Sequence, residues 1–198
     1  MLKHKLVIGT MSLALSVAIA ASANASLASN DDNNDVGEGT VCETSLGAVA
    51  VKGLVVPDGA SCTLDGTMVE QDIFVGSGAN LVANAVKVGG DIQGKGAKDV
   101  QIMPDSVVGG DIQLKEGGSA TMDHVKVRGD VQLELNSRML NVSATVVGGS
   151  LQVFKNTGGV TLNGNQVIED IQCKENTPDP TGGENSAGNK KEDQCAQL

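Results

Sequence analysis

The sequence predicts an all-β protein: a single-stranded right-handed parallel β-helix (β-solenoid) of about seven 20-residue coils with disulfide-tied caps. Three observations predict this fold. A short motif recurs every 19 or 20 residues, apolar residues alternate with polar ones inside each unit, and the 198 residues include 26 glycines but only two Phe and neither Trp nor Tyr. Without aromatic bulk, the core must be built from aliphatic side chains, which favours thin stacked layers.

The repeated motif reads V-x-G-D-I-Q. Its copies are VEQDIF at 69–74, VGGDIQ at 88–93, VGGDIQ at 108–113, VRGDVQ at 127–132, VGGSLQ at 147–152 and VIEDIQ at 167–172. A weaker copy at 49–55 lies about one step earlier. Self-similarity at a fixed period of this length indicates a repeat architecture, and seven coils are visible.

Apolar residues alternate within each unit, as in Val125, Val127, Val131 and Leu133. A period of two indicates strands, and several short strands per unit can bury an apolar face only by stacking on the next unit. A left-handed hexapeptide helix would show a strict six-residue apolar period, which is absent. The step that varies between 19 and 20 residues favours the right-handed form.

Two inward-facing columns follow from the alignment of the copies. The first is Ile73, Ile92, Ile112, Val131, Leu151 and Ile171, and the second is Val75, Gly94, Leu114, Leu133, Val153 and Cys173. The same alignment places Cys62 at the core position of Leu81. Buried sulfurs at both ends suggest Cys42–Cys62 and Cys173–Cys195 disulfides, although four cysteines allow three connectivities.

The chain divides into four segments. A basic start, an apolar run from 6 to 21 and the Ala23-Asn24-Ala25 end predict a signal peptide over 1–25, cleaved to leave a soluble secreted protein with no membrane span. Residues 26–48 are expected to form a polar leader and N-terminal cap. The parallel β-helix is predicted at 49–173, and an irregular C-terminal cap or tail at 174–198.

Charge and cysteine usage restrict the partners. Cleavage removes Lys3 and Lys5, so Lys+Arg falls from 14 to 12 while Asp+Glu stays at 24, and the net charge moves from −10 to −12. Such a surface repels nucleic acid and anionic lipid. Four cysteines in the exported part indicate an oxidising compartment, extracellular or periplasmic, and the absence of C-x-x-C pairs disfavours zinc. No cofactor is predicted.

Acidic residues are the first candidates for a site. An outward column contains Asp72, Asp91, Asp111, Asp130 and Asp170, interrupted by Ser150. A calcium ladder is one interpretation, but Asp after Gly more often satisfies turn amides, so a structural role is favoured. The companion Gln column is expected to form an amide ladder. In the leader, Asp31, Asn33 and Asp35 have calcium-loop spacing, but Val36 and Cys42 occupy positions that need Gly and Glu, so a solvated leader is expected.

No catalytic residues are predicted. His124 is the only histidine after the signal peptide and is interpreted as a solvated turn residue, because His and its sequence neighbour Asp123 usually diverge in space. A polysaccharide-cleaving groove is hard to build with only Arg128 and Arg138 and no Trp or Tyr. An outward column of Asn80, Gln101, Thr121, Asn141 and Thr161 lacks the repeated T-x-T of an ice-binding face, so a generic wet face is expected.

The V-x-G-D-I-Q repeats, VPDGASCTLDG at 56–66, CKENTP at 173–178 and KEDQC at 191–195 resemble a group of small exported bacterial repeat proteins without an assigned function. The resemblance covers roughly 53–195. The repeat rhythm is also similar to that of bactofilins, which are cytoskeletal solenoids. Bactofilins are cytoplasmic and lack cysteine-tied caps, so the signal peptide and cysteines depart from their pattern. The resemblance implies a right-handed parallel β-helix with a structural or surface role and no catalytic residues.

The sequence therefore predicts a secreted, non-enzymatic structural or adhesive β-solenoid of a bacterial envelope or extracellular matrix. The alternative is a carbohydrate-binding or polysaccharide-cleaving β-helix. Extracellular polysaccharide or a surface or matrix protein is the expected partner. The oligomeric state is not predicted.

Overall fold

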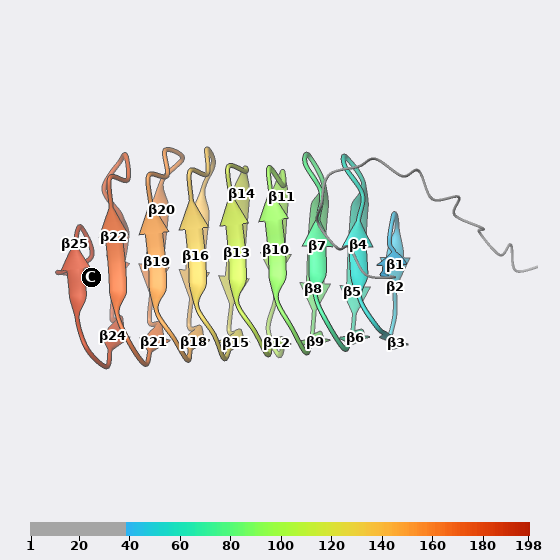
Figure 1. Ribbon diagram of the computed structural model, residues 1–198. Coiled ribbons are helices and arrows are strands. Elements are labelled where there is room, and N and C mark those ends of the chain that lie inside the picture. The colour runs from blue at the N-terminus through green and yellow to red at the C-terminus, as the bar shows by residue number, and fades with distance from the viewer. Residues whose placement is uncertain (1–38) are drawn as a thin grey trace, which may run out of the picture. The chain divides into compact units, whose positions relative to one another are not determined.

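A computed structural model describes residues 39–198, which form a parallel β-solenoid without helices (Figure 1). The predicted signal peptide at 1–25 and the calcium-loop residues Asp31, Asn33 and Asp35 lie outside the described residues. No helix in the described part of the chain has the length and apolarity needed for a membrane span.

Three parallel sheets run along the solenoid, and the strands below are those of residues 39–198. Sheet A contains, in spatial order, β1 (Thr40–Val41), β4 (Leu54–Val56), β7 (Ile73–Val75), β10 (Ile92–Lys95), β13 (Ile112–Lys115), β16 (Val131–Glu134), β19 (Leu151–Phe154), β22 (Ile171–Lys174) and β25 (Lys191–Asp193). Sheet B contains β2 (Ser45–Leu46), β5 (Ser61–Asp65), β8 (Asn80–Asn84), β11 (Asp99–Ile102), β14 (Ser119–Asp123), β17 (Leu140–Ser143), β20 (Val160–Asn163) and β23 (Thr181–Gly183). Sheet C contains β3 (Ala50–Val51), β6 (Met68–Val69), β9 (Lys87–Val88), β12 (Val107–Val108), β15 (Lys126–Val127), β18 (Val146–Val147), β21 (Gln166–Val167) and β24 (Ser186–Ala187).

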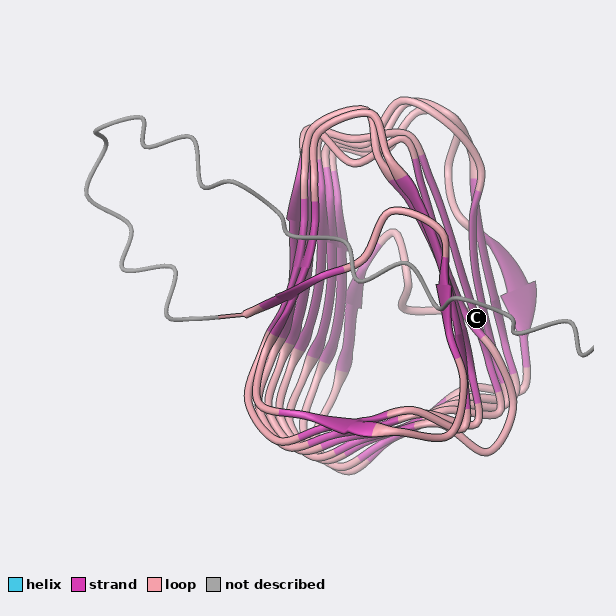
Figure 2. Cartoon of the chain, turned by 90° about the vertical axis from the view of Figure 1, so that its right-hand side faces the viewer, coloured by secondary structure: helices cyan, strands magenta, loops and turns pink. Residues whose placement is uncertain are grey.

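Each coil contributes one strand to each sheet, so the cross-section has three sides (Figure 2). Within residues 39–198, seven regular coils run from β4 to β24, with the shorter β1–β3 turn before them and β25 after them. Seen from the N-terminal end in Figure 2, the chain ascends through sheet A and descends through sheet B as it recedes, which is the right-handed sense. The predicted fold class is confirmed.

Strand register aligns the predicted core columns. Ile92 pairs with Ile73 on one side and Ile112 on the other, and the column continues through Val131, Leu151 and Ile171. All six side chains are at most 1% exposed. Because side chains alternate across a strand, this register also directs the intervening residues to the outer face. The core of the described residues is aliphatic, as the composition predicts.

Both ends are closed by the expected disulfides. Cys42 bonds Cys62 with 5.6 Å between their Cα atoms, and Cys173 bonds Cys195 with 5.2 Å. All four cysteines are at most 3% exposed. At the C-terminal end, Leu198 packs against the core. These contacts cover the apolar interior where stacking stops, and the two disulfides are consistent with an oxidising compartment.

The sheets extend beyond the predicted 49–173 segment. Strands of sheets A and B begin at Thr40 and Ser45, and the residues from Thr181 to Asp193 continue all three sheets, so the C-terminal segment is not an irregular tail. The terminal coils lack the apolar signal that marks the others. In β25, Lys191 and Glu192 pair with Ile171 and Gln172. The apolar repeat therefore does not predict the last strand, although its backbone pairs with β22 like the strands before it.

Ile112→Asp is expected to destabilise the protein by several kcal/mol, because it places an unpaired carboxylate in the core of a middle coil. Gln113→Asp is the matched control, since Gln113 lies on the outer face of the same strand, and it should cost much less. Equilibrium urea unfolding of the two variants measures the difference. Equal losses would contradict the inside and outside assignment of sheet A.

Candidate functional site

The outward Asp column joins neighbouring coils. Oδ1 of each aspartate accepts a hydrogen bond from the backbone N–H at the equivalent position of the next coil. The N–H groups of Asp91, Asp111, Asp130 and Ser150 reach Asp72, Asp91, Asp111 and Asp130 over 2.7, 2.8, 2.8 and 2.8 Å. In residues 39–198, no three His, Cys, Asp or Glu side chains gather closely enough to hold a metal ion. These hydrogen bonds support the structural role expected for the Asp column. The amide that each carboxylate binds belongs to the following coil.

A glycine in the following coil makes room for the carboxylates of Asp72, Asp91, Asp111 and Asp130. A Cβ atom on Gly110 would lie 2.0 Å from Oδ1 of Asp91, and the same 2.0 Å contact recurs for Gly90, Gly129 and Gly149 with the aspartates of their preceding coils. Where Ser150 replaces Asp, the next coil carries Glu169 in place of Gly. There the Ser150 hydroxyl donates to Glu169 over 3.1 Å. Glycine is therefore found where the preceding coil carries an aspartate. The exception is the last coil, where Asn189 occupies the glycine position and the N–H of Lys190 donates to Asp170.

The Gln column forms different contacts from those predicted. Nε2 of Gln93 donates to Oδ2 of Asp91 in the same coil over 3.1 Å, and Gln113 makes the equivalent bond to Asp111 over 3.5 Å. The expected amide ladder along the axis is therefore wrong for these two residues. The neighbouring carboxylate is a charged acceptor that competes successfully with the next glutamine.

Buried asparagine ladders are a feature that the sequence analysis missed. Between sheets A and B, Nδ2 of Asn136 donates to Oδ1 of Asn156 over 3.1 Å, and Asn156 donates to Asn176 over 3.0 Å. Between sheets B and C, Asn165 donates to Asn185 over 2.8 Å. Their 20-residue spacing was the available signal. No buried side-chain N or O atom in residues 39–198 lacks a hydrogen-bond partner.

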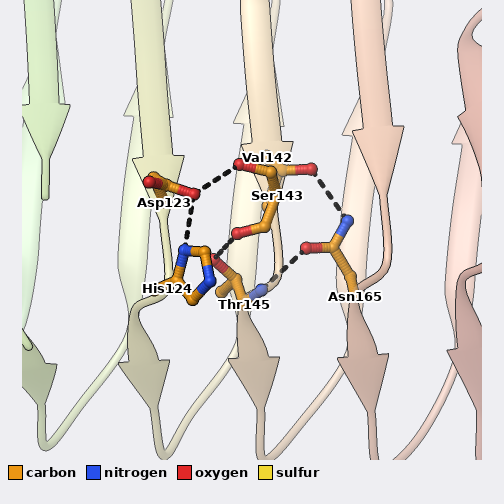
Figure 3. Close-up of polar contacts among 6 residues, drawn as sticks. All are labelled: Asp123, His124, Val142, Ser143, Thr145 and Asn165. Carbon is orange, nitrogen blue, oxygen red and sulfur yellow. Dashed lines mark hydrogen bonds and ion pairs between the residues drawn. The ribbon is translucent and has the colours of Figure 1, made fainter. Parts of the chain in front are cut away.

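A small polar cluster lies at the end of sheet B (Figure 3). Asp123 ends β14 and pairs in register with Ser143, which ends β17. Oδ1 of Asp123 accepts from the Ser143 hydroxyl over 2.8 Å and lies 2.8 Å from Nδ1 of His124. His124 is in the following left-handed turn, with φ of 52° and a side chain that is 65% exposed. The solvated turn histidine is as expected, but its predicted divergence from Asp123 is wrong.

Buried contacts behind this cluster hold the turn. The Thr145 hydroxyl donates to the carbonyl of Ser143 over 3.0 Å, and its N–H donates to Oδ1 of Asn165 over 3.0 Å. Nδ2 of Asn165 donates to the carbonyl of Val142 over 2.8 Å (Figure 3). The outward cluster is therefore built on a corner whose polar groups are paired.

The connectivity of the cluster differs from that of a nucleophilic triad. In a triad the histidine lies between the hydroxyl and the carboxylate, so that it can take the hydroxyl proton. Here Asp123 lies between Ser143 and His124. The hydrogen bond from the Ser143 hydroxyl is the largest cause and lowers the pKa of Asp123 below its ordinary 3.8; burial opposes it, and His124 adds smaller lowering effects. The arrangement stabilises a carboxylate and does not activate the hydroxyl.

The outer column of sheet B also needs a correction. Val82, and not Asn80, pairs with Gln101, while Asn80 pairs with Asp99. The column therefore continues from Val82 through Gln101, Thr121, Asn141 and Thr161. The five-residue strand β8 has three outward positions, Asn80, Val82 and Asn84, and the repeat alone did not decide among them.

The outer face of sheet A carries both phenylalanines of the chain. Phe74 is in register with Gln93 and Val55, and Phe154 is in register with Glu134 and Lys174. Both rings are partly exposed. Phe74 separates two open grooves, one lined by Gln71, Asp72 and the Gly89–Gly90 backbone, the other by Asp58, Gln93, Lys95 and Glu116 among others. A smaller groove borders Phe154. We define the outer face of sheet A between these two rings as the phenylalanine face.

Comparison with known proteins gives no match to a family model, a curated protein or a solved structure.

Ser143→Ala is expected to raise the pKa of Asp123 towards its ordinary 3.8 and to cost up to about 1 kcal/mol at neutral pH, because the carboxylate is 34% exposed and water screens it. A depressed pKa stabilises the fold above the unfolded pKa, and this stabilisation is lost as pH falls through the folded pKa. The deficit of the variant should therefore shrink below about pH 4.

Urea unfolding of the native protein and Ser143→Ala between pH 7 and 2 measures this deficit. Ser137→Ala is the control, because the Ser137 hydroxyl donates to the carbonyl of Gly117 and not to a carboxylate. Its deficit should not change with pH. A Ser143→Ala deficit that stays constant or grows in acid would refute the role of Asp123.

Proposed function

We propose that the protein is a secreted, non-enzymatic structural or adhesive element of a bacterial envelope or extracellular matrix. One observation carries the proposal: the aspartates and the buried asparagines that recur from coil to coil bind the neighbouring coil. The Asp column accepts backbone amides along the axis, and the asparagine ladders fill the buried corners. These recurring residues stabilise the stacking of the coils into a rod. The rod has three long outer faces, one for each sheet.

The dimensions and closed ends support this role. Seven coils at about 4.8 Å per step give a rod of roughly 34 Å. The two disulfides tie both ends, which suits a protein that works outside the cell without chaperones or reductants. The signal peptide expected at 1–25 and the repeat rhythm similar to bactofilins support export and a structural role respectively.

A carbohydrate-binding protein is the second candidate, favoured by the two outward phenylalanines and the grooves beside them. For cleavage, the polar cluster of Asp123, His124 and Ser143 offers a carboxylate in contact with a histidine. It belongs to sheet B, whereas the phenylalanines belong to sheet A. This candidate therefore agrees with the proposed adhesive role if the protein binds a polysaccharide without cleaving it.

Fractionation of cells that produce the protein, followed by a reducing-sugar assay on the purified chain, tests the proposal. The protein is expected in the envelope or extracellular fraction with a new N-terminus at Ser26. Incubation with a panel of polysaccharides should release no reducing ends. Retention in the cytoplasm, or release of reducing ends in proportion to protein concentration, would overturn the proposal.

A further inference from the structure

We propose that the phenylalanine face binds a linear, uncharged polysaccharide, with Phe74 and Phe154 as two stacking platforms. This inference rests on the proposed adhesive role and names the partner class and the face. It starts from the placement of the aromatic residues. The chain has two aromatic side chains among 198 residues, and both lie on the outside of the same sheet.

Neither phenylalanine contributes to the core. The apolar core of residues 39–198 is formed by aliphatic residues, Met122 and cysteines. An aromatic ring held partly in water forfeits much of the free energy that its burial would provide. A ring in this position gains most when a ligand covers it.

Both rings also interrupt a polar column. At the position of Phe74, the later coils carry Gln93, Gln113, Gln132, Gln152 and Gln172. At the position of Phe154, the other coils carry Lys95, Lys115, Glu134 and Lys174. The solenoid therefore stacks without an aromatic residue at either position, so stacking does not explain the two departures.

The groups around Phe74 suit sugar hydroxyls. The groove on one side offers the Gln71 amide and the Asp72 carboxylate, and the groove on the other offers Gln93. Lys95 and Glu116 in the second groove form a 3.5 Å ion pair, so that their charges offset each other. An apolar platform flanked by a few hydrogen-bonding groups matches a sugar ring, which has an apolar C–H face and a polar rim.

The spacing of the rings indicates a polymer. Phe74 in β7 and Phe154 in β19 are separated by four strand steps, roughly 19 Å along the axis (Figure 1). The Gln column runs between them with one amide per coil. A ligand that contacts both rings must therefore be a chain of about 20 Å or more, with hydroxyl groups along its length.

Charge and spacing favour an uncharged glycan over other occupants. The net charge of −10 repels polyanionic glycans. A protein partner or a second copy of this chain would need its aromatic anchors clustered in one desolvated centre. Here the two rings are far apart, with glutamines between them.

The repeat supplies variants that fit the fold. Phe74→Gln and Phe154→Lys introduce the residues that neighbouring coils carry at these positions. The full exported chain, each single variant and the double variant are run in native affinity electrophoresis with mixed-linkage β-glucan, xyloglucan, galactomannan and dextran. Thr121→Ala, on the outer column of sheet B, is the matched control. Thermal unfolding by circular dichroism checks each fold.

At least one of these polysaccharides is expected to retard the native protein. Each single variant should weaken the apparent affinity about tenfold, and the double variant should migrate as in the absence of polysaccharide. Thr121→Ala should bind like the native protein, and all variants should unfold at similar temperatures.

Three results would overturn the proposal: no retardation of the native protein by any of the four polysaccharides, equal retardation of the native protein and the double variant, or a native dimer that Phe74→Gln converts to a monomer in sedimentation. The proposed adhesive role is judged separately. If the double variant stays in the envelope fraction without releasing sugars, that role stands and only the assigned face is wrong.

Discussion

The hydrogen bond from a backbone N–H to the aspartate carboxylate of the preceding coil is the interaction on which the rest of the solenoid depends. It runs along the axis and joins equivalent positions of four consecutive pairs of coils, from Asp72 to Ser150. In the middle coils a Cβ at this position would lie 2.0 Å from the carboxylate, which explains the glycine of the motif. A side-chain acceptor therefore joins equivalent positions of successive coils and accounts for the Gly and Asp of the motif.

The aliphatic core follows from this fixed register. A slip of one residue would turn the inward columns outward, because side chains alternate along each strand. The aspartate bonds hold the register at the corner between sheets C and A. Aliphatic side chains can then stack on the equivalent residues of the next coil, and they fill the core without aromatic residues. The asparagine ladders do comparable work at the other two corners in the C-terminal half, where Asn136, Asn156 and Asn165 satisfy buried backbone carbonyls. The phenylalanines are left free for the outer face.

The sequence predicts the sheets and the caps because the signals there are periodic. Ile112 and Cys173 lie in columns that the repeat aligns directly, and the core positions of Cys62 and Cys173 suggested the two disulfides that the structure contains. The terminal coils escape prediction because β25 carries Lys191 and Glu192, whose polarity hides a strand that pairs normally. The contact of His124 with Asp123 depends on a left-handed turn, which one local pair of residues does not specify. The phenylalanine face was missed for a different reason. Phe74 and Phe154 are isolated departures from the repeat, and only the strand register shows that both lie on the outer face of sheet A.

A double-mutant cycle on Asp130 and Gly149 tests the central claim most directly. A Cβ on Gly149 would lie 2.0 Å from Oδ1 and 3.1 Å from Cγ of Asp130, whereas the nearest backbone atom is 3.2 Å away. Gly149→Ala should therefore cost about 1 to 3 kcal/mol in urea unfolding, and this cost should fall by about 1 kcal/mol or more when Asp130→Ala is also present. Gly183→Ala, with open space around its Cβ, should change little. Costs that simply add for Gly149→Ala and Asp130→Ala would contradict the account, because the glycine would then serve some purpose other than accommodating the carboxylate.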